Sequence, residues 1–449
     1  MNLKATQNEA NKLAFKMAFA LVLGLMVGTG FIFLREHLIA SQAEQTWNTI
    51  NSILFQDITQ EGAQNAVGIF YILGQLFINS LQLVIVPMVF TSIALAMCNI
   101  SDTKKLGRIS YKTILGFLTT SVLALIIAGV IGITAHNMGL FNVEISNMQA
   151  ANTSTGSNPL VVLLQAIPNN ISDVFSQNGR VLAIVFLAVA TGLCINALGE
   201  QIRVLKTLLE EVNKIITVFL SFVITKFGPY AIFVLITRTF AIYGVEHLKP
   251  AFAYVVVVIF TLSLFLVFGY AIFVAVGAKL NPMSFVKKIS KVALFGFSTS
   301  SSAATLPLNT KTTVEELGAN EEVSSFILPL GMTINMNGTA IMQVIAATFI
   351  ASSAGYEITV GSLLMISLLA LIASVGTPAA PGAGAIILFT VLTGMGYNND
   401  AALLAYSLIL AINRPVEMLV TSLNVVGDAA TCMVVSKSEG LLNEEVYNS

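Results

Sequence analysis

Charged residues are scarce in this chain. Asp, Glu, Lys and Arg together make up 10% of its 449 residues, whereas soluble domains carry about 25%. Hydrophobic residues make up 56%, and the mean hydropathy is +0.84. This composition excludes an ordinary soluble domain. The net charge of −1 and the lack of a long basic run give no indication of a nucleic-acid partner, so the expected surroundings are a lipid bilayer.

Cysteine and histidine are also rare, with three residues of each. Cys98, Cys194 and Cys432 lie in apolar runs without CxxC spacing, which favours buried free thiols over a disulfide or a metal site. The histidines are far apart in the sequence, so we expect no zinc cluster. Neither an HExxH motif nor a nucleophile–base pair is evident, and we predict that the chain is not an enzyme.

Long apolar runs fill most of the sequence. They lie at about 14–34, 67–98, 110–135, 180–198, 208–242 and 251–278, with less uniform apolar regions at 285–312, 323–395 and 401–435. At about 20 residues per membrane helix, this length supplies eight or more spans. The run from Ala14 to Leu34 is long enough to span and lacks a convincing cleavage site. We interpret it as a first membrane helix and not as a removed signal peptide.

Basic residues gather in four clusters between these runs. The clusters are Lys4/Lys12/Lys16, Lys104/Lys105/Arg108/Lys112, Arg203/Lys206/Lys214 and Lys279/Lys287/Lys288/Lys291. The first three intervals each hold two apolar runs, so all four clusters and both termini can face the cytoplasm, as the positive-inside rule requires. The polar segments 35–66 and 136–178 then lie outside. Chance clustering is the alternative.

Two segments near the C-terminus have apolar arms around a polar or Gly/Pro-rich centre. VALFGFSTSSSAATLPLNTK (292–311) begins and ends near lysines, so we predict that it enters the membrane and returns. LLMISLLALIASVGTPAAPGAGAIILFTVL (363–392) must enter from the other side if Lys437 is cytoplasmic. Two such units form an inverted repeat, whose tips would meet in mid-membrane at a site suited to a charged solute and cations. A surface loop is the alternative for the serine-rich segment.

A polar stripe crosses the last apolar region. Arg414, Glu417, Thr421, Asn424 and Asp428 follow at intervals of three or four residues, which places them on one face of a helix. A charge in mid-membrane costs at least about 2.5 kcal/mol, so this stripe indicates a binding site or an ion path. The alternative is a structural ion pair between Arg414 and Glu417.

The segment GMTINMNGT (331–339) is a second polar cluster in an apolar span. We expect its two glycines and its Thr and Asn side chains to unwind a helix and to expose carbonyl oxygens. Such oxygens suit Na⁺, a hard cation, and Asp428 and Glu417 are the carboxylates available to offset its charge.

Five motifs, in order along the chain, resemble the glutamate transporter family, the dicarboxylate/amino acid:cation symporters. They are NPLVVLLQAIPNN, FSTSSSAATLP, LPLGMTINMNGTA, ASVGTPAAPGAGAI and NVVGDAATCMVVSKSEG, and the resemblance covers nearly the whole sequence. It implies an all-α polytopic membrane protein with eight transmembrane helices and two re-entrant helical hairpins, arranged as inverted repeats in an elevator-type transporter. An archaeal member of this family is a known example of such repeats.

The resemblance also implies a division of the chain. Residues 1–105 and 176–249 would form scaffold and trimerisation helices, as spans 1, 2, 4 and 5. Residues 106–135 and 250–437 would form the transport domain, with spans 3 and 6, hairpin 1 at 285–312, span 7 at 323–354, hairpin 2 at 361–395 and span 8 at 401–435. We expect a homotrimer in a bacterial inner membrane.

Substrate and Na⁺ ligands follow from the same resemblance. The substrate would contact Ser300, Ser302, Thr339, Ala380, Gly384, Glu417, Thr421 and Asn424. One Na⁺ site would use Gly331, Asn335, Asn424 and Asp428. A second would use Thr333, Ser374, Val375 and Thr377, and a third Thr120, Ser121, Asn335 and Asn337. In this scheme Glu417 meets the amino group of the substrate, Asn424 meets its α-carboxylate, and hairpin 2 acts as a gate.

Four positions depart from the family pattern. Members with acidic substrates carry an arginine where this chain has Val420, and its balancing acid where this chain has Asn413. A second substrate carboxylate would therefore be buried unpaired, at a cost of several kcal/mol. Glu417 replaces a shorter aspartate. Asn337 replaces the aspartate of an NMDGT motif, so the third cation site is weak or fewer Na⁺ ions are coupled.

These features predict Na⁺-coupled symport of a neutral amino acid. One alternative is a carrier of cystine, of an acidic amino acid or of a dicarboxylate, with Arg414 as the anion partner. An ion channel is the alternative from another class. It needs a continuous pore, whereas two gated hairpins imply alternating access.

Overall fold

The structure is a computed structural model that describes residues 3–59, 62–98, 104–141, 167–176, 180–243, 248–375, 377 and 382–449. Within these residues the named elements are all helices, and one isolated antiparallel bridge joins Ala319 to Leu442. The prediction of an all-α protein is therefore confirmed for the described part of the chain.

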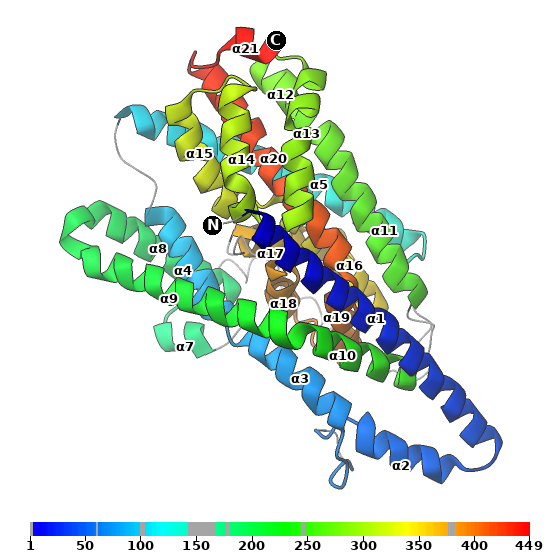
Figure 1. The fold of residues 1–449 in the computed structure, drawn as a ribbon. Helices are drawn as coiled ribbons and strands as arrows, with labels where there is room; N and C mark the ends of the chain where they lie inside the picture. The colour runs from blue at the N-terminus through cyan, green and yellow to red at the C-terminus, as the bar shows by residue number, and fades with distance from the viewer. Residues whose placement is uncertain are drawn as a thin grey trace.

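One group of helices comes from the N-terminal half. It consists of α1 (Leu3–Ala40), α2 (Glu44–Leu54), α3 (Ile69–Gln82), α4 (Ile85–Cys98), α7 (Ile171–Ser176), α8 (Val181–Leu198), η1 (Gly199–Ile202), α9 (Arg203–Phe222), η2 (Val223–Phe227) and α10 (Gly228–Tyr243). α1 lies along α10, and α4 packs against α8 and α9 (Figure 1). The π-helical turn η2 joins α9 to α10.

A second group surrounds α20. Its members are α5 (Lys104–Asn137), α11 (Leu248–Leu264), η4 (Phe265–Gly269), α12 (Tyr270–Ala278), α13 (Pro282–Thr299), α14 (Ser302–Glu315), α15 (Glu321–Ile334), α16 (Asn337–Ser353), α17 (Val360–Val375), α18 (Ala383–Met395), α19 (Asp400–Ile412), α20 (Arg414–Ser438) and α21 (Glu444–Asn448). α20 runs through the middle of this group and contacts α13, α15, α16, α12 and α5 (Figure 1).

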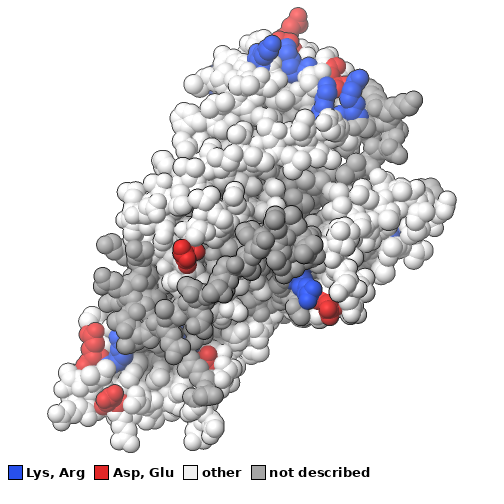
Figure 2. Space-filling view, turned by 180° about the vertical axis from the view of Figure 1, so that it is seen from behind, with Lys and Arg blue, Asp and Glu red and all other residues white. Residues whose placement is uncertain are grey.

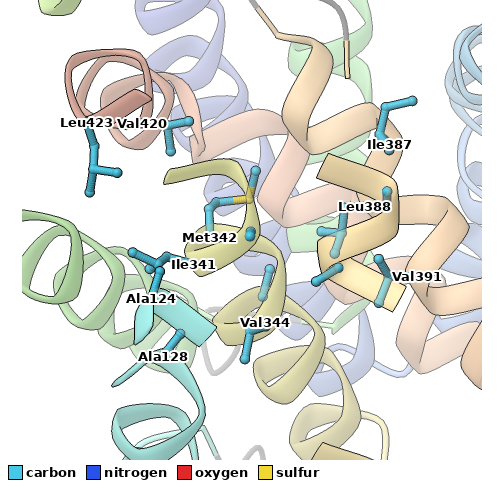
Figure 3. Packing of buried hydrophobic residues seen from close by; sticks show 14 of the residues in the cluster. Ala124, Ala128, Ile341, Met342, Val344, Ile387, Leu388, Val391, Val420 and Leu423 are labelled. Carbon is cyan, nitrogen blue, oxygen red and sulfur yellow. The ribbon is translucent and has the colours of Figure 1, made fainter. Parts of the chain in front are cut away.

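The core of this second group is built around α16, which is buried over almost its whole length. Ile341 of α16 lies beside the small side chains of Ala124 and Ala128 on α5, while Leu388 and Val391 of α18 line its other side (Figure 3). Small residues allow the backbones of neighbouring helices to approach closely. α16 therefore fixes the relative positions of α5, α18 and α20.

Large apolar side chains are exposed on the outer helices. They include Phe15, Phe19, Met26 and Phe33 on α1, Leu118, Val122, Ile126 and Val130 on α5, and Phe252, Val256 and Phe260 on α11. An apolar surface of this extent fits lipid or protein neighbours and not water. Most of the Lys and Arg side chains visible in Figure 2 gather at the end of the molecule that carries α21.

Six described stretches are long and apolar enough to cross a membrane. They are Val22–Ala40, Arg108–Asn137, Arg203–Ile242, Pro250–Ala278, Glu321–Ser353 and Arg414–Ser438, and they fall on the predicted spans 1, 3, 5, 6, 7 and 8. Predicted span 2 is divided into α3 and α4, and predicted span 4 contains the shorter apolar helix Ala183–Leu198. The structure is thus that of a polytopic membrane protein, and the number of eight spans stays a prediction.

The cysteines are free, as predicted, but they do not share one environment. Cys98 and Cys432 are buried, whereas Cys194 on α8 is exposed. The prediction of burial is therefore wrong for Cys194, because an apolar run also supplies the outward face of a helix.

Both predicted hairpins and predicted span 7 are divided into two helices each. Hairpin 1 consists of α13 and α14, hairpin 2 consists of α17 and α18, and in each pair the helices pack against each other. Span 7 divides into α15 and α16 around Asn335 and Met336, as the GMTINMNGT segment predicts.

Span 8 has a break that the prediction of a single span over 401–435 did not include. α19 ends at Ile412, and α20 begins at Arg414 with Pro415 in its first turn. Proline has no N–H to donate to the preceding turn, so it favours the start of a new helix. The helix that carries the polar stripe from Arg414 to Asp428 is confirmed.

Residues 441–449, which we call the C-terminal clasp, fold back onto hairpin 1. The Nζ of Lys288 donates to the carbonyls of Glu316, Val446 and Tyr447 at 3.1, 2.8 and 2.8 Å. The hydroxyl of the buried Tyr447 donates to the carbonyl of Asn281 at 2.6 Å. The clasp therefore ties the start of α13 to the end of α14.

Candidate functional site

A small cavity lies where the two hairpins, the break in span 7 and α20 meet. It is lined by Ser300, Ser302, Met336, Thr339, Thr377, Gly382, Gly384, Glu417, Val420, Thr421 and Asn424. Seven of the eight predicted substrate residues are in this lining, and the eighth, Ala380, lies outside the described residues.

The tip of hairpin 1 places the N-terminus of α14 at the cavity wall. Ser300 ends α13 in the left-handed conformation, with φ of +48°. Ser301 is extended, and its Oγ accepts a hydrogen bond from the backbone N–H of Ala304 at 3.3 Å. The buried Oγ of Ser300 has no hydrogen-bond partner among the described residues. The N-terminus of a helix and an available hydroxyl make this tip suitable for a carboxylate.

The polar stripe of α20 forms the opposite wall. Asn424 links it to the break in span 7, because its Oδ1 accepts a hydrogen bond from the N–H of Gly338 at 2.8 Å. Its Nδ2 faces the sulfur of Met336 at 3.2 Å and the hydroxyl of Thr339 at 3.4 Å. Val420 adds an apolar patch to this wall. Glu417 is the one ionisable residue in the part of the lining that the structure describes.

The Glu417 carboxylate has partners on two sides. Its Oε1 accepts a hydrogen bond from the backbone N–H of Ala385 at 3.4 Å. Its Oε2 is 4.0 Å from Nη1 of Arg414, and both side chains are nearly buried. The ion pair considered from the sequence is therefore present. Arg414 itself is not part of the cavity lining, and its Nε has no hydrogen-bond partner among the described residues.

Three residues predicted for the first Na⁺ site, Gly331, Asn335 and Asp428, lie together outside the described cavity lining, and the fourth, Asn424, lines the cavity. Asp428 is 2% exposed, and its Oδ1 accepts a hydrogen bond from Nδ2 of Asn335 at 3.0 Å. A Cβ at Gly331 would lie 2.4 Å from the same oxygen, so only glycine lets the backbone approach this closely. A buried carboxylate beside a helix break has the oxygen chemistry that a hard cation requires.

Three of the four residues predicted for the third Na⁺ site, Thr120, Ser121 and Asn337, are joined by hydrogen bonds, whereas Asn335 donates to Asp428. Ser121 donates to Oδ1 of Asn337 at 2.5 Å, and Nδ2 of Asn337 donates to Thr120 at 2.9 Å. The same Nδ2 donates to the hydroxyl of Tyr270 at 3.0 Å. The amide of Asn337 thus forms hydrogen bonds with the hydroxyl groups that a cation would need as ligands.

The residues predicted for the second Na⁺ site lie at the ends of α15 and α17, which contact each other. The hydroxyls of Thr333, Ser374 and Thr377 donate to carbonyls of their own segments at 2.9, 2.8 and 3.1 Å. Val375 is the last residue of α17. Thr377 also lines the cavity, so this group borders the substrate residues.

Sequence reasoning did not single out Met336, Tyr270 or Ala385. Met336 stands between the two asparagines of the span 7 break, and its position in the break is the signal that could have identified it. Tyr270 places a hydroxyl group in an otherwise apolar run, and a buried tyrosine hydroxyl usually has a hydrogen-bond partner. The backbone N–H of Ala385 carries no sequence signal.

A family model, described as the sodium:dicarboxylate symporter family, matches residues 13–438. The proton/sodium-glutamate symport protein of Bacillus caldotenax is 27% identical over 384 residues, covering 83% of this chain and 88% of that protein. The C4-dicarboxylate transport protein of Cupriavidus pinatubonensis is 30% identical over 374 residues, covering 82% and 85%. The proton/glutamate-aspartate symporter of Escherichia coli is 27% identical over 442 residues, covering 95% and 93%.

The match over nearly the whole chain agrees with the resemblance drawn from the five motifs, and it places the protein in a family of membrane transporters. The chain belongs to the sodium:dicarboxylate symporter family.

Proposed function

We propose that the protein couples Na⁺ entry to the uptake of a neutral amino acid. The observation that carries this proposal is the charge of the cavity lining. Among the described residues of the lining, Glu417 is the only ionisable one, and Val420 provides no cation for a second carboxylate. A zwitterion brings one carboxylate and one ammonium group, which the lining can pair without an unmatched charge.

Each end of such a zwitterion has a matching partner. The α-carboxylate meets the N-terminus of α14, the free hydroxyl of Ser300 and the amide of Asn424. The ammonium group meets the carboxylate of Glu417. A small side chain then lies against Val420 and Met336, with the hydroxyls of Thr339 and Thr421 in the same lining.

Asn424 supports the coupling of Na⁺ to substrate. It lines the cavity, binds the backbone of Gly338 and lies one helical turn before Asp428. In this proposal one Na⁺ is held by Asp428, Asn335 and the carbonyl of Gly331. A second Na⁺ is held by the four residues of the second predicted site, Thr333, Ser374, Val375 and Thr377. Because the sites share neighbouring residues, Na⁺ and the substrate stabilise each other's binding, which is reciprocal by linkage.

The transport cycle follows the elevator scheme. The second group of helices, with the two re-entrant hairpins, moves as the transport domain against scaffold helices that form a homotrimer. Hairpin 2 opens as the gate. The protein works in the bacterial inner membrane with both termini in the cytoplasm, as the basic clusters favour.

A carrier of an acidic substrate is the second candidate, and two observations favour it. The relatives described above are glutamate or C4-dicarboxylate transporters by name. Arg414 has a buried Nε without a partner among the described residues, and this guanidinium would serve a second carboxylate after a rotamer change. Against this reading, Arg414 lies outside the cavity lining and faces Glu417.

The two candidates are separated by competition for uptake. The purified protein is reconstituted into liposomes with a Na⁺ gradient, after a thermal-shift screen of amino acids and dicarboxylates with and without Na⁺ has identified a ligand. We expect serine, alanine, threonine or cysteine to stabilise the protein and to compete, and aspartate, glutamate and succinate to compete poorly. A preference for aspartate or succinate by about tenfold, roughly 1.4 kcal/mol, would favour the acidic-substrate reading.

A further inference from the structure

The first turn of α18 depends on a side chain from another helix. Gly382 is the N-cap residue of α18, with φ of +86°, and it has no side chain with which to cap the helix. The residues that follow, from Ala383 to Leu388, are buried, so water does not reach their N–H groups freely. Buried N–H groups at a helix start require a partner. Glu417 of α20 supplies it, through the hydrogen bond to Ala385 and a contact with the backbone of Gly382.

The length of the glutamate side chain makes this contact possible. The hydrogen bond to Ala385 is already long at 3.4 Å. An aspartate at the same position is shorter by one C–C bond, about 1.5 Å, and would fall out of hydrogen-bond range. Its charge would remain in the cavity. The contact with α18 is therefore a property of glutamate at this position and not of an acid in general.

Arg414 holds the carboxylate in place from the other side. Its guanidinium lies 4.0 Å from Oε2, one turn earlier on α20, and its side chain is 13% exposed. Both oxygens of Glu417 thus have protein partners when no substrate is present. An acid reserved for the ammonium group of a ligand would not need either of them.

We propose that Glu417 is a positioning residue that fastens the first turn of α18 to α20 in the substrate-free protein. In a symport cycle the empty carrier must close before it returns, and this link holds hairpin 2 against α20 during that step. An arriving ammonium group then takes over one of the two oxygens. The inference uses the carrier cycle of the proposed function but does not depend on which substrate is carried.

Two variants of Glu417 separate length from charge. Glu417→Asp keeps the charge and loses the reach, whereas Glu417→Gln keeps the reach and loses the charge. The measurement is hydrogen–deuterium exchange of the 382–390 segment in the purified, substrate-free protein. We expect this segment to exchange about tenfold faster in Glu417→Asp, and within about threefold of the wild type in Glu417→Gln. Thr421→Ser is the matched control, because the hydrogen bond of the Thr421 hydroxyl is to the carbonyl of Glu417 within α20, and we expect this segment to keep the wild-type exchange rate.

A second measurement tests the role in the cycle. Net uptake requires the empty carrier to return, whereas exchange of internal for external substrate does not. For Glu417→Asp, the ratio of net uptake to exchange falls about tenfold, because only the empty step uses the link. Unchanged exchange of the 382–390 segment in Glu417→Asp, or equal acceleration in both variants, overturns the link. An unchanged uptake ratio overturns its role in the cycle. The hydrogen-exchange result is independent of the substrate screen, so a failure of the neutral-substrate proposal is recognised separately.

Discussion

The carboxylate of Asp428 and the backbone of Gly331 lie so close that no side chain fits between them. A methyl group at residue 331 would be 2.4 Å from Oδ1 of Asp428. α15 ends three residues later, at Ile334, and the carbonyls of Gly331 and Ile334 accept hydrogen bonds from the N–H groups of Asn335 and Met336. A buried acid and a helix end therefore meet at one point, which is where we place a Na⁺ ion.

Asp428→Asn should abolish the stabilisation of the protein by Na⁺. The amide keeps the shape but removes the charge that offsets the cation. At Na⁺ concentrations about 100 times Kd, the wild type gains about 2.7 kcal/mol, and the variant should gain close to none. Thermal unfolding in Na⁺ against a choline salt measures this. Ser324→Ala, a buried change at the same α15–α20 contact, should keep the full Na⁺ response. A normal response in Asp428→Asn would remove Asp428 from the site.

Val420→Arg should shift the selectivity from neutral to acidic substrates. The new guanidinium would enter the cavity lining and pair with a second carboxylate, while the cavity becomes less favourable for a small neutral side chain. We expect at least about a tenfold change in the ratio of the two uptake efficiencies, the factor for roughly 1.4 kcal/mol. Val420→Leu controls for size. If both variants shift the ratio equally, volume and not charge sets the selectivity.

Asn337→Asp should create or strengthen a cation site. The wild-type amide is engaged with Ser121, Thr120 and Tyr270 and donates where a cation would need acceptors. A carboxylate accepts instead, and in this buried position it gains from a bound cation. We expect a higher Na⁺ affinity or a steeper Na⁺ dependence of uptake. Reversal potentials of the reconstituted wild type check the premise: three coupled Na⁺ ions would show that Asn337 does not impair the third site.

Glu439 should make the stability of the protein depend on pH on the acid side. Hydrogen bonds from Lys112 and Arg108 lower the pKa of this carboxyl below its ordinary value. The folded protein therefore binds this proton less well than the unfolded chain. The stabilisation is complete above the unfolded pKa of about 4.3 and is lost as the pH falls through the lower, folded pKa.

Replacing Glu439 by Gln tests this linkage. The variant should be less stable than the wild type at neutral pH, by a modest amount because Arg108 is 65% exposed, and the two should converge toward low pH. Melting temperatures of the solubilised proteins across the acid range provide the comparison. Glu445→Gln, a change at an exposed acid near the same end, should leave the curve parallel to that of the wild type.

The parts of the structure that the sequence predicted are those with a local cause. The stripe from Arg414 to Asp428 follows from helical periodicity, and the break near Asn335 follows from the clustering of Gly and Asn. The residues of the site were predicted from the resemblance of the five motifs to a known family, because no local rule brings Ser300 next to Glu417. The break at Asn413 had a signal in Pro415, which the apolar character of the region obscured.

Contacts between residues that are distant in the sequence could not be predicted from local sequence features. The hydroxyl of Tyr270 meets Asn337 only because η4 and α12 place it there, and the length of Glu417 matters only once the start of α18 is known. The identity of a residue does not reveal which group its backbone N–H donates to. Such contacts determine whether an aspartate or a glutamate suits a position. The effect of a residue that departs from a family motif can therefore be explained only when the fold is known.

The C-terminal clasp has a consequence for how this protein is made. The carbonyl of Val446 that accepts from Lys288 belongs to a residue synthesised 158 positions later. Until that residue has left the ribosome and the insertion machinery, Lys288 lacks two of its three acceptors and the base of hairpin 1 is unfinished. We therefore expect the base of hairpin 1 to reach its final packing late in biogenesis, after the residues of α20 have been synthesised.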